Sequence, residues 1–168
     1  MVTDNNASQS AINKGPVLVT VDFAPDSEAA VAWAATQATC IKAPLLILQV
    51  VHDPAYAPGF YRQEGEDWSR PMEDIAVQMM EEFMTKMISA HSDLNLLAEA
   101  KIMLISGLPP SRILEVAEME RAQLIVVGSR GRTGLPHVLL GSVAERVAQT
   151  APIPVVIIKS YEKEGEVE

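Results

Sequence analysis

Runs of consecutive apolar residues occur five times along the chain, and most of their members are valine, isoleucine or leucine. Short runs that are apolar at successive positions are typical of strands buried on both faces of a sheet. The predicted strands are residues 16–21, 45–51, 101–105, 124–127 and 154–158. A sheet built from them needs cover on both sides.

Segments with helical patterns separate these runs. Residues 29–39 are rich in alanine, a strong helix former, and Asp26 or Ser27 can cap that helix. Apolar residues then recur three or four positions apart, in the order Met72, Ile75, Met79, Phe83 and Met87. Further helices are predicted at about 109–121 and 138–149. Strands that alternate with helices predict an α/β fold: a single open five-stranded parallel sheet with helices on both faces, as in Rossmann-like proteins.

The composition fits one globular domain. The chain has 168 residues, of which 48% are hydrophobic, enough for a core without disulfides or structural metal. We expect residues 15–159 to form the domain, between a flexible N-terminal arm at 1–14 and an acidic tail at 160–168. A formal net charge of −9 and only 5% aromatic residues argue against a nucleic-acid-binding surface.

Other features bear on the cellular compartment. The N-terminal residues contain no apolar signal segment, and no apolar run approaches the roughly 18 residues that a membrane span needs. The single cysteine, Cys40, lies among alanines and is expected to pack as a small apolar residue. One cysteine cannot form an internal disulfide, so we expect a reducing, cytoplasmic location without membrane insertion.

Two segments carry candidate chemistry, and each follows a predicted strand. Asp22 follows the first strand, and the sequence GSRGRTG at 128–134 follows the fourth. Ligands of open parallel sheets bind beyond the carboxyl ends of the strands. Glycines permit positive φ and let backbone N–H groups approach an anion closely, and Ser142 near a helix start would favour phosphate. A tight strand-to-helix turn that needs glycine only for its geometry is the alternative explanation.

The spacing of the glycines points to a family. Two residues separate Gly128 from Gly131, and nine separate Gly131 from the pair Gly141-Ser142. This G-2x-G-9x-G-[ST] pattern resembles the ATP-binding subclass of the universal stress protein family, and the resemblance extends over residues 15–159. It implies the strand order 3-2-1-4-5. It also implies an adenine nucleotide, ATP, ADP or AMP, with Mg²⁺ or Mn²⁺ held by the phosphates.

The same resemblance implies roles for individual residues. Val50 would contact adenine through its backbone, and Asp22 would lie beside the ribose or the adenine. Gly128 would line the ribose, and the phosphates would lie against Gly131, Gly141, Ser142 and Val143. Arg130 and Arg132 would supplement the phosphate contacts. The resemblance further implies a homodimer that pairs through the edge strand from Pro154 to Ile158.

Three functions stay open at this level. The first is an ATP-binding, dimeric regulatory or stress-response module with at most slow hydrolysis, because no nucleophile with a paired base can be identified. The second is a protein-interaction module of the same fold that uses no nucleotide. The third is an ATP-activating enzyme of the wider adenine nucleotide α-hydrolase-like group, whose second substrate site would have to lie in the long loop at 52–70. No histidine has the spacing of a metal ligand.

Overall fold

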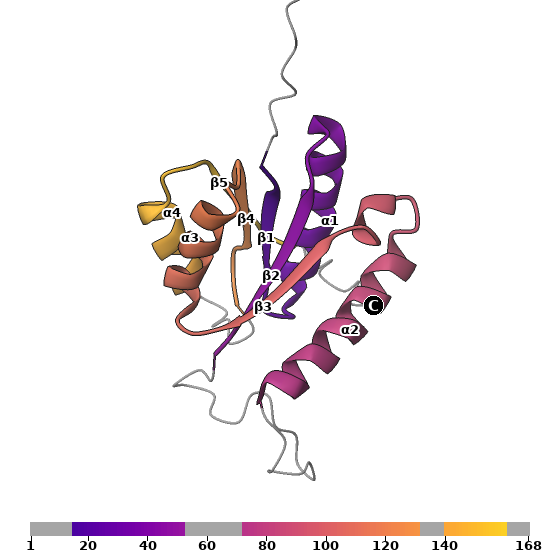
Figure 1. The fold of residues 1–168 in the computed structure, drawn as a ribbon, viewed down its shortest axis with the longest axis horizontal. Coiled ribbons are helices and arrows are strands. Elements are labelled where there is room, and N and C mark those ends of the chain that lie inside the picture. Colours follow the sequence, from indigo (N-terminus) through magenta and orange to yellow (C-terminus); the bar gives the residue numbers. More distant parts are fainter. Residues whose placement is uncertain (1–14, 53–71, 132–139, 161–168) are drawn as a thin grey trace, which may run out of the picture.

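The structure, a computed structural model, describes residues 15–52, 72–131 and 140–160. Its strands are β1 (Val17–Val21), β2 (Leu45–Val51), β3 (Lys101–Ser106), β4 (Leu124–Gly128) and β5 (Val155–Ile158). Its helices are α1 (Pro25–Ile41), α2 (Met72–Ala90), α3 (Pro109–Met119) and α4 (Ser142–Thr150), with a short 3₁₀ turn, η1, at Asn95–Leu97. Figure 1 shows the sheet between α1 and α2 on one side and α3 and α4 on the other.

The five strands form one parallel sheet in the order β3-β2-β1-β4-β5. The predicted architecture and the strand order implied by the resemblance are therefore both confirmed. Each observed strand begins and ends within one residue of its predicted range. β1 lies at the centre, and β3 and β5 are the two edges.

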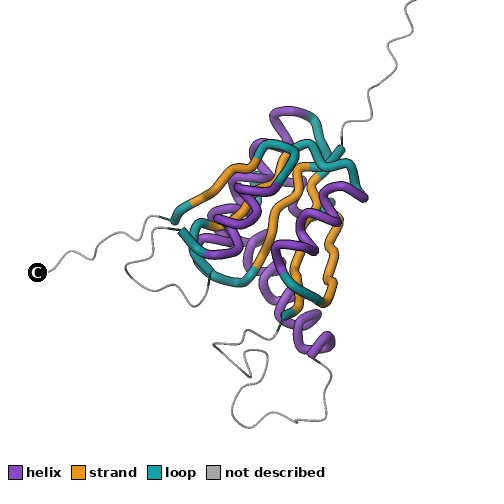
Figure 2. The backbone as a smooth tube through the Cα atoms, turned by 90° about the vertical axis from the view of Figure 1, so that its left-hand side faces the viewer, coloured by secondary structure: helices purple, strands orange, loops and turns teal. Residues whose placement is uncertain are grey.

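Consecutive residues of a strand enter two different cores. Val17 and Val19 pack in the core that β1 shares with α1 and α2, whereas Leu18 packs in the core shared with α3 and α4. The side of the molecule with α3 and α4 faces the viewer in Figure 2. All three side chains are fully buried, and each such burial contributes about 1.5–3 kcal/mol. The two-sided cover explains why the strands are apolar at successive positions.

The start of α1 differs from the prediction. The helix begins at Pro25, and its N-cap is Ala24, so the prediction that Asp26 or Ser27 caps it is wrong. Proline suits the first helical position, because its fixed φ is helical and it has no N–H to leave unsatisfied there. The prediction that Cys40 packs in the core is also wrong: its side chain is exposed, off the alanine-lined face that the helix buries.

Two other helix boundaries differ from the predicted ones. The last helix begins at Ser142, later than the predicted 138, with Gly141 as its N-cap. The Gly141-Ser142 pair therefore opens this helix rather than interrupting it. α3 ends at Met119 instead of Arg121, whose φ of 53° lies in the left-handed region and cannot continue a right-handed helix.

Several predictions concern parts of the chain outside the described ranges. These are the N-terminal arm, the acidic tail after Ser160, the loop at 52–70 apart from His52, and Arg132. Among the helices that the structure does describe, none combines the length and hydrophobicity of a membrane span.

Candidate functional site

β1 and β4 separate at their carboxyl ends. Their last paired residues are Val19 and Val126, although both strands continue beyond this pair. The chain leaves β1 for β2 on one side and reaches β4 only later on the other, so this is the topological switch point at which open α/β sheets bind ligands. Asp22 directly follows β1, and Gly128 ends β4. The structure thus brings the two candidate segments to the same switch point.

The Asp22 carboxylate is held by the turn that leads into α1. Its Oδ1 accepts hydrogen bonds from the Ala24 N–H (3.1 Å) and from the Ser27 hydroxyl. The Asp22 N–H donates to Ser27 Oγ at 3.1 Å. Phe23, between Asp22 and Ala24, has a left-handed φ of 63°, a conformation that costs about 1–2 kcal/mol. Its ring packs edge-on against Phe83, with 5.6 Å between the ring centroids, which helps to offset that cost.

The glycines that bracket the loop after β4 are needed for space, not for backbone conformation. Neither Gly128 nor Gly131 has a φ in the left-handed region. A Cβ on Gly128 would lie 3.1 Å from the backbone carbonyl carbon of Asp26, and one on Gly131 would lie 3.0 Å from Asp22 Oδ2. Of the two properties of glycine considered from the sequence, close approach is the one that the fold uses here.

A buried carboxylate organises the same loop from the α1 side. Asp26 is 2% exposed, and its Oδ2 accepts hydrogen bonds from Ser129 Oγ (2.6 Å) and from the Arg130 N–H (3.0 Å). Its Oδ1 accepts from the Ser160 N–H (2.9 Å) and from the Ser160 hydroxyl. Burial by itself would raise the pKa of Asp26. The hydrogen bonds from Ser129, Ser160 and Arg130 outweigh burial and hold this pKa well below its ordinary value.

Ser129 connects three segments through its three polar groups. Its hydroxyl donates to Asp26 in α1, and its N–H donates to the Ile158 carbonyl of β5 at 2.7 Å. Its carbonyl accepts from the N–H of Gly141, the N-cap of α4, also at 2.7 Å. A Cβ on Gly141 would lie 3.3 Å from that carbonyl oxygen. The start of α4 therefore packs directly against the loop after β4.

The first turn of α4 offers backbone donors beside this loop. Ser142 is exposed and Val143 is half-buried, and no described side chain caps the helix. The first N–H groups of a helix have no partner within the helix and attract anions. Asp22, Gly131, Gly141 and this first turn thus line one region of the structure.

The two remaining candidate residues occupy different surroundings. Val50 pairs with Ile105 of β3 but lies beyond the last residue of β2 that pairs with β1, so its backbone extends past the end of the central strand. The Arg130 guanidinium contacts Asp26 through two distances of 3.4 Å. Arg130 therefore has a partner within the protein, whereas Arg132 lies outside the described residues.

Sequence reasoning missed Asp26 and Ser129 as the residues that hold the loop. The acidic residue after Pro25 suggested only a helix cap, and the serine stood within a motif defined by its glycines. The two residues are 103 positions apart, so no local pattern connects them. That Ser129 bonds to the buried Asp26 can be seen only in the folded structure, where strand pairing brings the two residues together.

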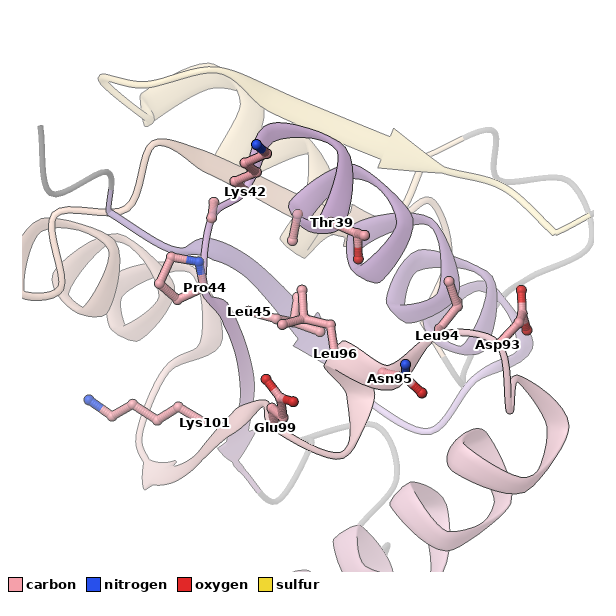
Figure 3. A pocket seen from close by; sticks show the side chains of 12 residues that line it. Thr39, Lys42, Pro44, Leu45, Asp93, Leu94, Asn95, Leu96, Glu99 and Lys101 are labelled. Atoms are coloured by element: carbon pink, nitrogen blue, oxygen red, sulfur yellow. The ribbon is translucent and has the colours of Figure 1, made fainter. Parts of the chain in front are cut away.

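A separate hollow lies at the other end of the strands. It has a volume of about 640 Å³, and its lining includes the end of α1 and the starts of β2 and β3. Figure 3 shows Lys42, Asp93, Glu99 and Lys101 around it, and all four are exposed. None of the candidate site residues borders this hollow. Within the described ranges, no group of three or more His, Cys, Asp or Glu side chains is placed to hold a metal ion.

Comparisons with known sequences give one consistent family. Residues 15–159 match the model of the universal stress protein family. The universal stress protein MJ0531 of Methanocaldococcus jannaschii is 49% identical over 61 residues, which are 36% of this chain and 36% of that protein. The universal stress protein Rv2623 of Mycobacterium tuberculosis is 31% identical over 159 residues, which are 95% of this chain and 50% of that protein. The chain spans about half the length, or less, of the curated relatives it matches.

Solved structures share the fold. The protein MJ0577 of Methanocaldococcus jannaschii has a TM-score of 0.62 and 24% identity, covering 90% of this chain and 100% of that chain. A universal stress protein in complex with cAMP has a TM-score of 0.58 and 24% identity, covering 86% and 96%. The universal stress protein from Archaeoglobus fulgidus in complex with dAMP has a TM-score of 0.53 and 24% identity, covering 88% and 100%.

Proposed function

Because the chain belongs to the universal stress protein family, we propose that the switch point between β1 and β4 forms a crevice that binds an adenine nucleotide, with ATP as the ligand. One observation carries this proposal: the loop after β4 approaches Asp22 so closely that a Cβ on Gly131 would lie 3.0 Å from the carboxylate. A turn that needed glycine only for backbone conformation would place it at a positive φ, and Gly131 has none. The proteins of this fold that are bound to cAMP and dAMP support adenine as the base.

The charge of Asp22 restricts how a nucleotide can lie in the crevice. An ionised carboxylate only accepts hydrogen bonds and repels phosphate. Asp22 would therefore face the ribose hydroxyls or the adenine amino group, which are donors, and the backbone of Val50 would contact the adenine. The ribose would lie along Gly128.

The phosphates would lie at the other end of the nucleotide, where backbone donors gather. They would lie against the backbone of Gly131 and Gly141, and the N–H groups of Ser142 and Val143 at the start of α4 would bind them. Arg130 could add a charge–charge contact if its guanidinium turned from Asp26. A Mg²⁺ or Mn²⁺ ion would be carried by the phosphates themselves.

The edge strand β5 is the proposed contact between two copies of the chain. Its side chains are half-buried except for Ile157, which is 36% exposed. An uncovered edge strand presents unpaired backbone groups, and pairing with its own copy about a two-fold axis would satisfy them. We accordingly propose a cytoplasmic homodimer that acts as a nucleotide-dependent regulatory or stress-response module, with at most slow ATP hydrolysis.

Calorimetric titration of the nucleotide-stripped protein with ATP and Mg²⁺ tests the proposal. We expect saturable binding by the wild type and its loss in Gly131→Val, because the added side chain enters the space beside Asp22. Asp93→Asn is the matched control, since it removes a carboxylate at the opposite end of the strands, beside the separate hollow, and should bind like the wild type. Folded wild-type protein that gives no binding heat and no protection against thermal unfolding by ATP would refute the proposal.

A further inference from the structure

We propose that Asp26 is a positioning residue for the phosphate groups of the nucleotide. Its buried carboxylate holds the backbone of Ser129 and Arg130, the two residues directly before Gly131, in the shape that receives phosphate. This inference rests on the proposed function, that the crevice binds ATP, and goes beyond it by assigning phosphate affinity to a residue outside the glycine motif.

The contacts of Asp26 reach two successive loop residues at once. A single oxygen, Oδ2, accepts from Ser129 Oγ at 2.6 Å and from the Arg130 N–H at 3.0 Å. Ser129 is itself 4% exposed, and its carbonyl accepts from the N–H of Gly141 at 2.7 Å. The carboxylate therefore determines the position of the loop and, through Ser129, the position of the α4 start. The α4 start carries the N–H groups of Ser142 and Val143 that would bind phosphate, and the loop lies against it.

Charge alone would argue against an acid at this place. A buried negative charge beside an anion site repels the anion, and the low local dielectric strengthens that repulsion. The same carboxylate makes charge-assisted hydrogen bonds, which are stronger than neutral ones and well suited to holding a loop rigid. The two effects of Asp26 on phosphate binding have opposite signs, so a measurement can tell which one dominates.

Asparagine cannot reproduce the contacts of this carboxylate. Both oxygens of Asp26 accept hydrogen bonds, Oδ2 from Ser129 and the Arg130 N–H, and Oδ1 from Ser160 and, at 3.4 Å, from the Arg130 guanidinium. An asparagine amide has one acceptor oxygen and one donor nitrogen. Its nitrogen would therefore lie against donor groups, either those of the loop or those of Ser160, and could not accept their hydrogen bonds. Asp26→Asn therefore keeps the size of the side chain, removes its charge and releases either the loop or Ser160, which follows β5.

The role in phosphate binding predicts a specific split between two ligands. ATP needs the phosphate-binding segments, whereas adenosine has no phosphate and depends on the Asp22 and Val50 side of the crevice. Loosening the loop should weaken ATP and leave adenosine unchanged. A general loss of packing would weaken both ligands together.

The experiment compares the dissociation constants of ATP with Mg²⁺ and of adenosine for four proteins: wild type, Asp26→Asn, Ser129→Ala and Glu28→Gln. Ser129→Ala removes the hydroxyl that reaches Asp26 without changing any charge. Glu28→Gln is the charge control, because Glu28 lies in the same first turn of α1 but pairs with Lys86 of α2. We expect Asp26→Asn to weaken ATP by about tenfold or more, and Ser129→Ala to weaken it by at least about threefold. Adenosine should change by less than about twofold in both variants, as should both ligands in Glu28→Gln.

Three results would overturn the inference. The first is ATP binding that is tighter or unchanged in both Asp26→Asn and Ser129→Ala. Tighter binding would show that charge repulsion by Asp26 dominates, and unchanged binding would show that Asp26 has no effect on phosphate affinity. The second is an equal loss of ATP and adenosine. The third is wild-type protein that binds adenosine as tightly as ATP, so that no phosphate affinity exists to be positioned. If Asp26→Asn does not fold, Ser129→Ala decides. Failure of the wild type to bind either ligand refutes the proposed function itself and is seen before any variant is compared.

Discussion

Replacing Gly128 by alanine should destabilise the protein by about 1–3 kcal/mol, the usual cost of overpacking a filled site. The glycine ends β4, where the strand lies against the first turn of α1. An added Cβ would lie 3.1 Å from both the carbonyl carbon and the Cβ of Asp26, and 3.2 Å from the Ser27 nitrogen. All three distances are shorter than ordinary van der Waals contact between such atoms.

The neighbours of this Cβ cannot move aside independently. Two of them are backbone atoms of α1, and the third belongs to a side chain whose carboxylate is already fixed by Ser129 and Ser160. Relief therefore requires α1 to shift away from β4, which disturbs the alanines that α1 buries against the sheet. This is why we place the cost in the range of a rearranged core rather than in that of a surface substitution.

Urea unfolding followed by circular dichroism measures the effect. With a slope of about 2 kcal/mol per molar urea, a loss of about 2 kcal/mol lowers the midpoint by about 1 M. Gly131→Ala is the comparison variant, because among the described residues its Cβ would meet one side-chain atom, Asp22 Oδ2 at 3.0 Å, and no backbone atom. Alanine also gains about 0.4–1 kcal/mol from the unfolded chain, which partly offsets this single contact, so Gly131→Ala should lose less stability than Gly128→Ala. Equal midpoints for Gly128→Ala and Gly131→Ala would refute the argument that space at the end of β4 requires glycine.

Three further predictions test the core, the buried carboxylate and the sheet edge. Ile47→Ala, at a fully buried position of β2, should lower the free energy of unfolding by about 2–5 kcal/mol in urea. Ile102→Ala, at a position of β3 that is 42% exposed, should lower it by less than about 0.5 kcal/mol. Similar losses in the two variants would contradict the assignment of the core. Folding lowers the pKa of Asp26, so the ionised carboxylate stabilises the folded protein. This contribution is complete at pH values above the ordinary pKa of a carboxyl group and is lost as the pH falls below it. The difference in the free energy of unfolding between wild type and Asp26→Asn should therefore stay constant above about pH 5 and become smaller towards about pH 2. A difference that keeps its full size in acid would show that the pKa of Asp26 is not lowered. Ile157→Lys on the exposed edge of β5 should convert the proposed dimer to a folded monomer in analytical ultracentrifugation; identical sedimentation of the two proteins would argue against pairing at β5.

The strands were predictable because burial of a parallel strand leaves a local trace. A strand covered on both faces must be apolar at successive positions, and that pattern can be recognised without knowing which helix covers it. The helix starts were less predictable. α1 begins at Pro25 with Ala24 as its N-cap. Asp26, one of the two expected caps, instead accepts hydrogen bonds from Ser129 and Ser160, which lie just beyond β4 and β5.

The location of the candidate site followed from the sequence, but its construction did not. The spacing of Gly128, Gly131 and Gly141 predicted a loop at the carboxyl end of the fourth strand, and the family resemblance implied its ligand. The sequence left open whether the glycines serve conformation or close approach. The structure answers this for Gly131, because its φ is not left-handed and Asp22 lies next to the position of the missing Cβ.

By itself, then, the sequence determined the order of strands and helices, the apolar faces and the position of the glycines, since each depends on residues close together in the chain. Only the tertiary structure decided which atoms meet at the switch point. Asp26 and Ser129 are joined over 103 positions, and Asp26 and Ser160 over 134. Such contacts form only when β4 and β5 take their places beside β1 and α1, and no local pattern can encode a bond between groups that the fold alone brings together.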